Sequence, residues 1–92
     1  MKLGIIGNPL KHSYSKNIFE KKIDTEYRNY EIKSLKNIRN FIFKNKISGL
    51  NVTAPYKEEI IQHVDELESK TNKIKSVNTL KVCLKSNKIK GF

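Results

Sequence analysis

The chain has 92 residues, enough for one small domain with a modest hydrophobic core. Its formal net charge is +10, from 19 lysines and arginines against 9 acidic residues, which raises nucleic acid or another polyanion as a partner. Arg28 and Arg39 are the only arginines, however, and the lysines are spread from Lys2 to Lys90. Nucleic-acid recognition favours arginine in a cluster, so the composition favours a partner other than nucleic acid.

The single cysteine and the hydropathy pattern indicate what kind of protein this is. Cys83 has no partner for an internal disulfide, no paired cysteine and histidine spacing indicates a metal site, and its apolar surroundings predict a buried residue. No apolar run approaches the length of a membrane span, and the N-terminus has no signal-peptide pattern. We therefore expect a cytoplasmic protein with no membrane partner.

Strand-like and helix-like segments alternate through the first half of the chain. Strands are predicted for residues 2–6, 25–32 and 47–52, and the first of them ends in the turn-forming run Gly7-Asn8-Pro9. A polar loop over residues 10–15 leads to a helix from about Lys16. Ser34 is the expected N-cap of a second helix, which ends near Lys44 and has one apolar face formed by Leu35, Ile38, Phe41 and Ile42.

Residues 51–57 join the third strand to the second half of the chain, and Pro55 suits the first turn of a helix there. An amphipathic helix is predicted over residues 58–67, followed by a weaker helical turn over 68–74. A strand over 76–84, a turn at Ser86-Asn87 and a returning strand over 88–92 form a hairpin.

This alternation predicts an α/β domain with an open, mostly parallel twisted sheet, flanking helices and a C-terminal antiparallel hairpin. The only glycines are Gly4, Gly7, Gly49 and Gly91. No glycine-rich loop for a dinucleotide or a nucleoside triphosphate can be written with these positions.

Small polar side chains gather in three segments that follow or overlap predicted strands, at residues 8–15, 51–57 and 77–79. In a parallel sheet the loops after the first and third strands open at the same edge, where ligands bind. Serine hydroxyls can donate to a carboxylate, while threonine, lysine and asparagine can bind the hydroxyls of a polyol. Taken singly, each segment also has an ordinary explanation as a helix cap, a turn or a solvated lysine.

The order and spacing of the three segments distinguish between these interpretations. They resemble the G-N-P-x-x-H-S-x-S-P, G-L-N-V-T-x-P-x-K and A-V-N-T signatures of the shikimate dehydrogenase family, through Gly7-Asn8-Pro9-x-x-His12-Ser13-x-Ser15, Gly49-Leu50-Asn51-Val52-Thr53-x-Pro55-x-Lys57 and Val77-Asn78-Thr79. Asp65-Glu66-Leu67 is also similar to the D-E-L that is common in that family. The resemblance spans nearly the whole chain.

The resemblance implies that residues 1–92 are the N-terminal, substrate-binding domain of an enzyme that reduces 3-dehydroshikimate to shikimate with NADPH. Ser13 and Ser15 would hold the substrate carboxylate, while Thr53 and Asn78 would bind ring oxygens. Lys57 would bind the substrate as the catalytic lysine and donate a proton to the oxygen that gains negative charge as hydride arrives. An ammonium group suits that role because it both stabilises the charge and supplies the proton.

Several positions depart from the family pattern. Lys16 stands where the family usually has proline, and Phe19 and Glu20 stand where it often has His-Asn. These residues lie on the predicted helix after the serine loop, so they affect its packing more than the two hydroxyls. Tyr56 replaces a frequent histidine beside the lysine.

The end of the chain is also informative. Gly91-Phe92 resembles the start of the family's G-Y/F-N-T-D, so the sequence ends before the aspartate that would partner the lysine. NADP would be bound by a domain that is absent from this chain. We therefore expect a shortened form or a natural fragment of a longer enzyme, with no hydride-transfer activity of its own.

Two alternatives remain open at this stage. A quinate/shikimate dehydrogenase of broader specificity would share these motifs, and the cofactor domain that decides between NADP and NAD is not in this sequence. A small basic module that binds nucleic acid or a protein would instead show salt-sensitive binding to DNA or RNA and no response to shikimate.

Overall fold

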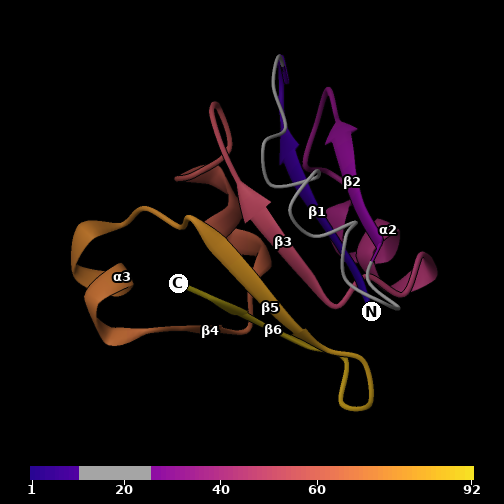
Figure 1. Ribbon diagram of the computed structural model, residues 1–92. Helices are drawn as coiled ribbons and strands as arrows, with labels where there is room; N and C mark the ends of the chain where they lie inside the picture. The colour runs from indigo at the N-terminus through magenta and orange to yellow at the C-terminus, as the bar shows by residue number, and fades with distance from the viewer. Residues whose placement is uncertain (11–25) are drawn as a thin grey trace.

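The computed structural model describes residues 1–10 and 26–92, which form a six-stranded sheet with helical segments beside it (Figure 1). The strand order is β2-β1-β3-β5-β6-β4. β1 pairs in parallel with β2 and β3, and β4 pairs in parallel with β6, whereas β5 is antiparallel to both β3 and β6. The strands are β1 Lys2–Gly7, β2 Glu26–Glu31, β3 Gly49–Val52, β4 Glu66–Leu67, β5 Thr79–Cys83 and β6 Lys88–Gly91. The predicted mostly parallel sheet with a C-terminal hairpin is confirmed.

Helical structure is limited to α2 (Ile38–Lys44), the 3₁₀ helix η1 (Glu59–His63) and α3 (Ser69–Ile74) in the described ranges. The predicted cap of α2 was wrong, because the N-cap position is Asn37 and its side chain makes no capping bond. The Ser34 hydroxyl accepts a hydrogen bond from the Lys36 amide at 3.1 Å, so it closes the turn before the helix. The helix predicted from about Lys16, and the loop before it from residue 11 onward, lie outside the described residues.

The helix predicted over residues 58–67 was wrong. η1 ends at His63, and Glu66–Leu67 forms the short strand β4, paired with Lys90 and Gly91 of β6. The amides on either side of β4 also bond to β6, since the Asp65 amide donates to the Ile89 carbonyl at 2.8 Å and the Glu68 amide to the Gly91 carbonyl at 2.9 Å. A strand partner distant in sequence therefore replaces the last helical turn.

The strand predicted over residues 76–84 is shorter, and Cys83 is exposed rather than buried. β5 begins at Thr79, and the Val77 amide before it bonds to the Lys57 carbonyl outside the sheet. Side chains alternate between the faces of a strand, so the burial of Leu80 and Val82 directs Cys83 to the opposite face. An apolar sequence neighbourhood did not indicate which face the cysteine takes.

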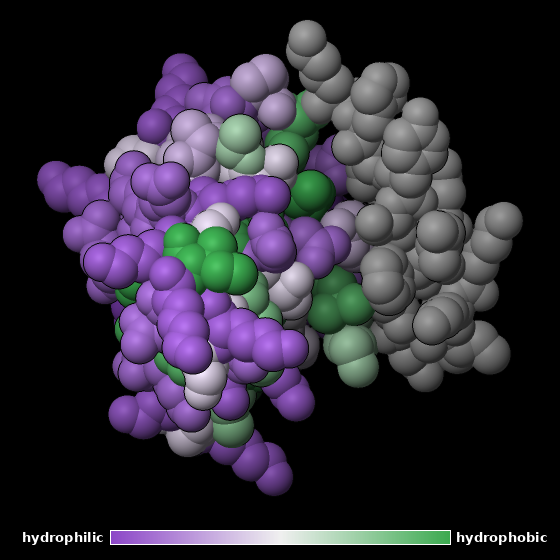
Figure 2. Space-filling model, turned by 90° about the vertical axis from the view of Figure 1, so that its left-hand side faces the viewer, coloured by the Kyte–Doolittle hydropathy of each residue, from purple (hydrophilic) through white to green (hydrophobic). Residues whose placement is uncertain are grey.

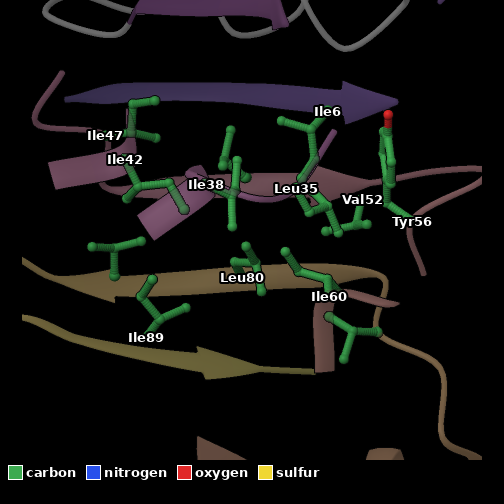
Figure 3. Close-up of a cluster of buried hydrophobic side chains, with 13 residues drawn as sticks. Ile6, Leu35, Ile38, Ile42, Ile47, Val52, Tyr56, Ile60, Leu80 and Ile89 are labelled. Carbon is green, nitrogen blue, oxygen red and sulfur yellow. The ribbon is translucent and has the colours of Figure 1, made fainter. Parts of the chain in front are cut away.

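The hydrophobic core lies on one face of the sheet. Figure 3 shows Ile6 of β1, Leu80 of β5 and Ile89 of β6 directed into the same space as the side chains of α2 and the residues just before it. Burying each such side chain contributes about 1.5–3 kcal/mol. Within this cluster, the residues with exposures of 2 % or less are Ile6, Leu35, Ile42, Ile47, Leu50, Ile60, Val77, Leu80 and Ile89.

The molecular surface around α3 and β4 is mainly hydrophilic, with a small hydrophobic patch in its middle (Figure 2). The largest exposed apolar side chain of α3 is Ile74, at 73 % exposure. No helix in residues 1–10 or 26–92 is long and apolar enough to cross a membrane.

Candidate functional site

The first and second polar segments meet at the carboxyl ends of β1 and β3. These strands are parallel neighbours, with Ile6 opposite Val52, so the segments that follow them leave the sheet at the same edge. The Thr53 amide donates to the Ile6 carbonyl at 3.0 Å, and the Asn8 amide donates to the Ala54 carbonyl at 3.1 Å. The start of the first loop, as far as residue 10, therefore lies beside the second loop as predicted.

The third polar segment joins the same edge through its backbone. The Val77 amide donates to the Lys57 carbonyl at 2.8 Å, and the Val52 amide donates to the Asn78 carbonyl at 2.7 Å. The Asn78 amide in turn donates to the Phe92 carbonyl at 2.7 Å. Backbone bonds thus bring Thr53, Lys57 and Asn78 to one region, although they come from segments far apart in sequence.

The side chains of these residues are available to a ligand. Lys57 and Asn78 are exposed and Thr53 is partly exposed. Within the part of the chain that the structure describes, no hydrogen bond occupies their side-chain polar atoms. A hydroxyl, an ammonium and an amide can together donate to and accept from several hydroxyl or carbonyl oxygens. Ser13 and Ser15, the predicted carboxylate-binding pair, lie outside the described residues.

Gly7 allows the two loops to approach closely. A Cβ atom at this position would overlap Thr53 Cγ2 and come within 2.8 Å of Leu10 Cδ2. A larger residue would therefore displace Thr53 from the end of β3. The sequence signal was the glycine before Asn8-Pro9, but a turn explained it equally well.

Lys57 lies in a turn and not in the first turn of a helix, so the predicted role of Pro55 was wrong. The Ala54–Pro55 peptide bond is cis, as is the Asn8–Pro9 bond of the neighbouring loop. η1 begins only at Glu59. Both prolines of the chain thus lie at this edge of the sheet.

Asn51 has contacts that the sequence did not reveal. Its side-chain Nδ2 donates to the Tyr27 hydroxyl of β2 at 2.9 Å, and its Oδ1 accepts from Thr79 Oγ1 of β5 at 3.5 Å. Both partners are on the sheet face opposite the core. From the sequence, Asn51 was notable only as a member of the second motif, two positions before Thr53. Asn51 therefore connects three strands beside the candidate site.

Residues 1–10 and 26–92 contain no glycine loop for the phosphates of a dinucleotide. All four glycines lie inside β1, β3 or β6, and none has a positive φ, so none forms a loop between a strand and a helix. Among residues 1–10 and 26–92 there is no group of three histidine, cysteine or acidic side chains that could hold a metal. The residues that the structure describes do not fit a bound NADP.

Comparison with known proteins agrees with the motif order. The family model described as the shikimate dehydrogenase substrate binding domain matches residues 5–80. The chain belongs to the shikimate dehydrogenase family. This match includes all three motifs in full.

Individual members of the shikimate dehydrogenase family are similar in sequence and in structure. The NADP(+) shikimate dehydrogenase of Pyrococcus furiosus is 48 % identical over 83 residues, covering 84 % of this chain and 31 % of that protein. The crystal structure of shikimate dehydrogenase 1 from Peptoclostridium difficile matches with a TM-score of 0.89 and 31 % identity, over 99 % of this chain and 36 % of that one.

A chorismate mutase/shikimate 5-dehydrogenase fusion protein from Clostridium acetobutylicum matches with a TM-score of 0.85 and 39 % identity, over 99 % of this chain and 35 % of that one. The chain spans about a third of the length of the curated relatives that it matches.

Proposed function

We propose that this chain is the substrate-binding part of an enzyme that reduces 3-dehydroshikimate to shikimate. The ligand lies at the carboxyl edge of β1 and β3, where Thr53 and Asn78 bind ring oxygens and Ser13 and Ser15 hold the carboxylate. The observation that carries the proposal is the Val77–Lys57 backbone hydrogen bond of 2.8 Å, because it joins the lysine motif to the asparagine motif.

Lys57 acts on the oxygen that gains electrons in the proposed reaction. When hydride adds to the carbonyl carbon of 3-dehydroshikimate, the carbonyl oxygen becomes an alkoxide and takes one proton. The ammonium of Lys57 stabilises the developing negative charge and transfers that proton. The exposure of the lysine lets it regain the proton from water.

NADPH supplies the hydride and is bound outside this chain. The absence of a glycine loop from residues 1–92 supports this division, and so does the NADP(+) in the names of relatives that are about three times longer. The isolated chain therefore binds substrate without turning it over.

An NMR titration of the isolated chain with shikimate tests the proposal. Shikimate should perturb the amides of Thr53, Lys57, Val77 and Asn78, while the amides of Val82 and Lys88, at the far end of the hairpin, should stay unchanged. Benzoate, a carboxylate without ring hydroxyls, serves as the control ligand and should perturb them less. The absence of any response at millimolar shikimate would contradict the proposal.

Two further ligands distinguish the alternatives. Quinate that binds as well as shikimate would indicate the broader quinate/shikimate specificity. Salt-sensitive binding of DNA or RNA, without a response to shikimate, would replace the enzyme hypothesis with the basic-module hypothesis.

A further inference from the structure

Tyr56 lies between the two proposed ligand-binding side chains of the second motif, Thr53 and Lys57, yet its own side chain is buried. It is only 4 % exposed, whereas Lys57 next to it is exposed. Figure 3 shows its ring at the carboxyl end of β1, with the oxygen directed away from the surrounding apolar side chains. The tyrosine is therefore part of the core and not of the exposed surface that a ligand could reach.

The hydroxyl of Tyr56 has one partner among the described residues, the carbonyl oxygen of Ile32, to which it donates a hydrogen bond. Ile32 directly follows β2, and its amide donates to the Gly7 carbonyl at 3.2 Å. The phenol thus connects the lysine-bearing turn to the ends of β1 and β2. The Tyr56 amide also donates to the Thr53 carbonyl at 3.1 Å, which closes the turn.

Lys57 is held on its other side by the Val77 amide. Its backbone is therefore fixed from two directions, by the buried phenol before it and by the Val77 bond at its own carbonyl. The four methylenes of its side chain stay free to move, so the position of the ammonium depends on where this backbone sits. Orientation of a proton donor matters because proton transfer needs hydrogen-bond distance to the reacting oxygen.

We infer that Tyr56 is a positioning residue for Lys57, acting through the hydrogen bond of its hydroxyl to the Ile32 carbonyl; the inference rests on the role proposed above for Lys57. Tyr56 makes no contact with substrate. Its hydroxyl holds the turn over residues 53–57 against the end of β2, so that Thr53 and Lys57 stay in register with Asn78.

Tyr56→Phe removes the hydroxyl and keeps the ring, and Tyr30→Phe is the matched control. The Tyr30 hydroxyl is buried and has no hydrogen-bond partner in the described part of the chain, so its removal deletes the same atom without breaking a bond there. The rate of hydrogen exchange at the Val77 amide reports on its bond to Lys57. The Val82 amide, which donates to the Ser48 carbonyl at 2.9 Å, is the reference, because it lies in β5 away from this turn.

In Tyr56→Phe, Val77 exchange should accelerate at least about fivefold relative to Val82, and in Tyr30→Phe the ratio should stay unchanged. A purely structural loss of stability would accelerate both amides together. An unchanged ratio in Tyr56→Phe would overturn the inference. In the unsubstituted chain, a Tyr56 hydroxyl proton that exchanges as fast as that of free tyrosine would overturn it without any substitution.

Shikimate titration separates this inference from the proposed function. If the unsubstituted chain responds to shikimate, Tyr56→Phe should weaken binding several-fold under conditions where it remains fully folded, and equal binding would overturn the inference. If the unsubstituted chain does not respond, the proposed function fails, and the exchange ratio still decides whether Tyr56 holds Lys57.

Discussion

The Val77 amide donates a 2.8 Å hydrogen bond to the carbonyl oxygen of Lys57. The two residues lie twenty positions apart in sequence, and Val77 is fully buried, so water does not compete for this bond. The bond fixes the start of one polar segment against the end of another.

Removal of the Lys57 ammonium should reduce turnover much more than substrate binding. In a full-length enzyme carrying this domain, Lys57→Ala should lower kcat by about 10²–10⁴, the usual contribution of a general acid. The KM for shikimate should change far less. Lys44→Ala, at the exposed end of α2, is the control and should leave both constants unaltered. A variant that loses binding but keeps kcat would remove Lys57 from proton transfer.

A methyl group at Gly7 should be costly. Gly7→Ala would place a Cβ against Thr53 Cγ2 and 2.8 Å from Leu10 Cδ2, so we expect a loss of about 1–3 kcal/mol of unfolding free energy, typical of overpacking. Gly49→Ala is the comparison, since its Cβ would come no closer than 3.1 Å to the flexible end of Leu3. Urea denaturation of both variants measures the difference, and equal losses would contradict the role of the close approach.

The hydroxyls of Tyr56 and Tyr30 should differ in their contribution to stability. Tyr56→Phe leaves the Ile32 carbonyl without its donor and should cost about 1–2 kcal/mol. Tyr30→Phe removes a buried hydroxyl that has no partner in the described residues, so unfolding free energy should stay the same or rise. Chemical denaturation with both variants tests this order, and the reverse order would refute it.

Asp65 should make stability depend on acid pH. Its Oδ2 accepts hydrogen bonds from the Ile89 amide and from Arg39 Nη1, both at 2.8 Å. These bonds, that of the Ile89 amide foremost, lower the pKa of the carboxyl in the folded chain. The stabilisation is therefore complete above the unfolded-state pKa of about 3.9 and is lost as pH falls toward the folded value.

Asp65→Asn should flatten this part of the stability profile and cost about 1 kcal/mol at neutral pH. Glu66→Gln is a suitable control, because the Glu66–Lys90 ion pair spans 3.6 Å between largely exposed side chains and such pairs contribute little. Melting temperatures of both variants measured from pH 2 to 7 would show this difference. If Asp65→Asn lost stability at acid pH as steeply as the unsubstituted chain, another carboxyl would be responsible for the pH dependence.

Cys83 should react faster with alkylating reagents than an ordinary thiol. It is exposed, and hydrogen bonds from the side chain and the backbone of Ser86 lower the pKa of its thiol. Since the thiolate is the nucleophile, the rate of iodoacetamide labelling should reach half its maximum at a lower pH than for a free cysteine, whose pKa is about 8.5. Ser86→Ala should move this midpoint upward, and an unmoved midpoint would exclude the Ser86 hydroxyl as the cause.

Local patterns predicted the strands and the hairpin well, because the residues that define them are neighbours in sequence. The helix over residues 58–67 failed for the opposite reason. Ile60, Val64 and Leu67 have helical spacing, but Leu67 pairs with Gly91, and no local pattern reveals that partner. Cys83 was misplaced because an apolar neighbourhood does not identify the face of a strand.

The side chains of the candidate site could be predicted from the sequence, but the hydrogen bonds that hold their backbone in place could not. Motif order singled out Thr53, Lys57 and Asn78, and the fold brings them to one edge. The bonds that hold this edge use the amide of Val77 and the carbonyl of Lys57, groups that almost any residue offers. The Tyr56 anchor is likewise hidden in the sequence, since its acceptor is a backbone carbonyl 24 positions away.

Support by main-chain atoms has a consequence for the evolution and engineering of this edge. The amides of Asn8, Thr53 and Val77 donate to backbone carbonyls, so these bonds do not depend on which side chains stand at the proposed ligand-binding positions. Thr53, Lys57 and Asn78 can therefore be exchanged singly, and ligand preference can diverge, while the peptide framework beneath them stays the same. Libraries that vary these three positions should yield mostly folded proteins.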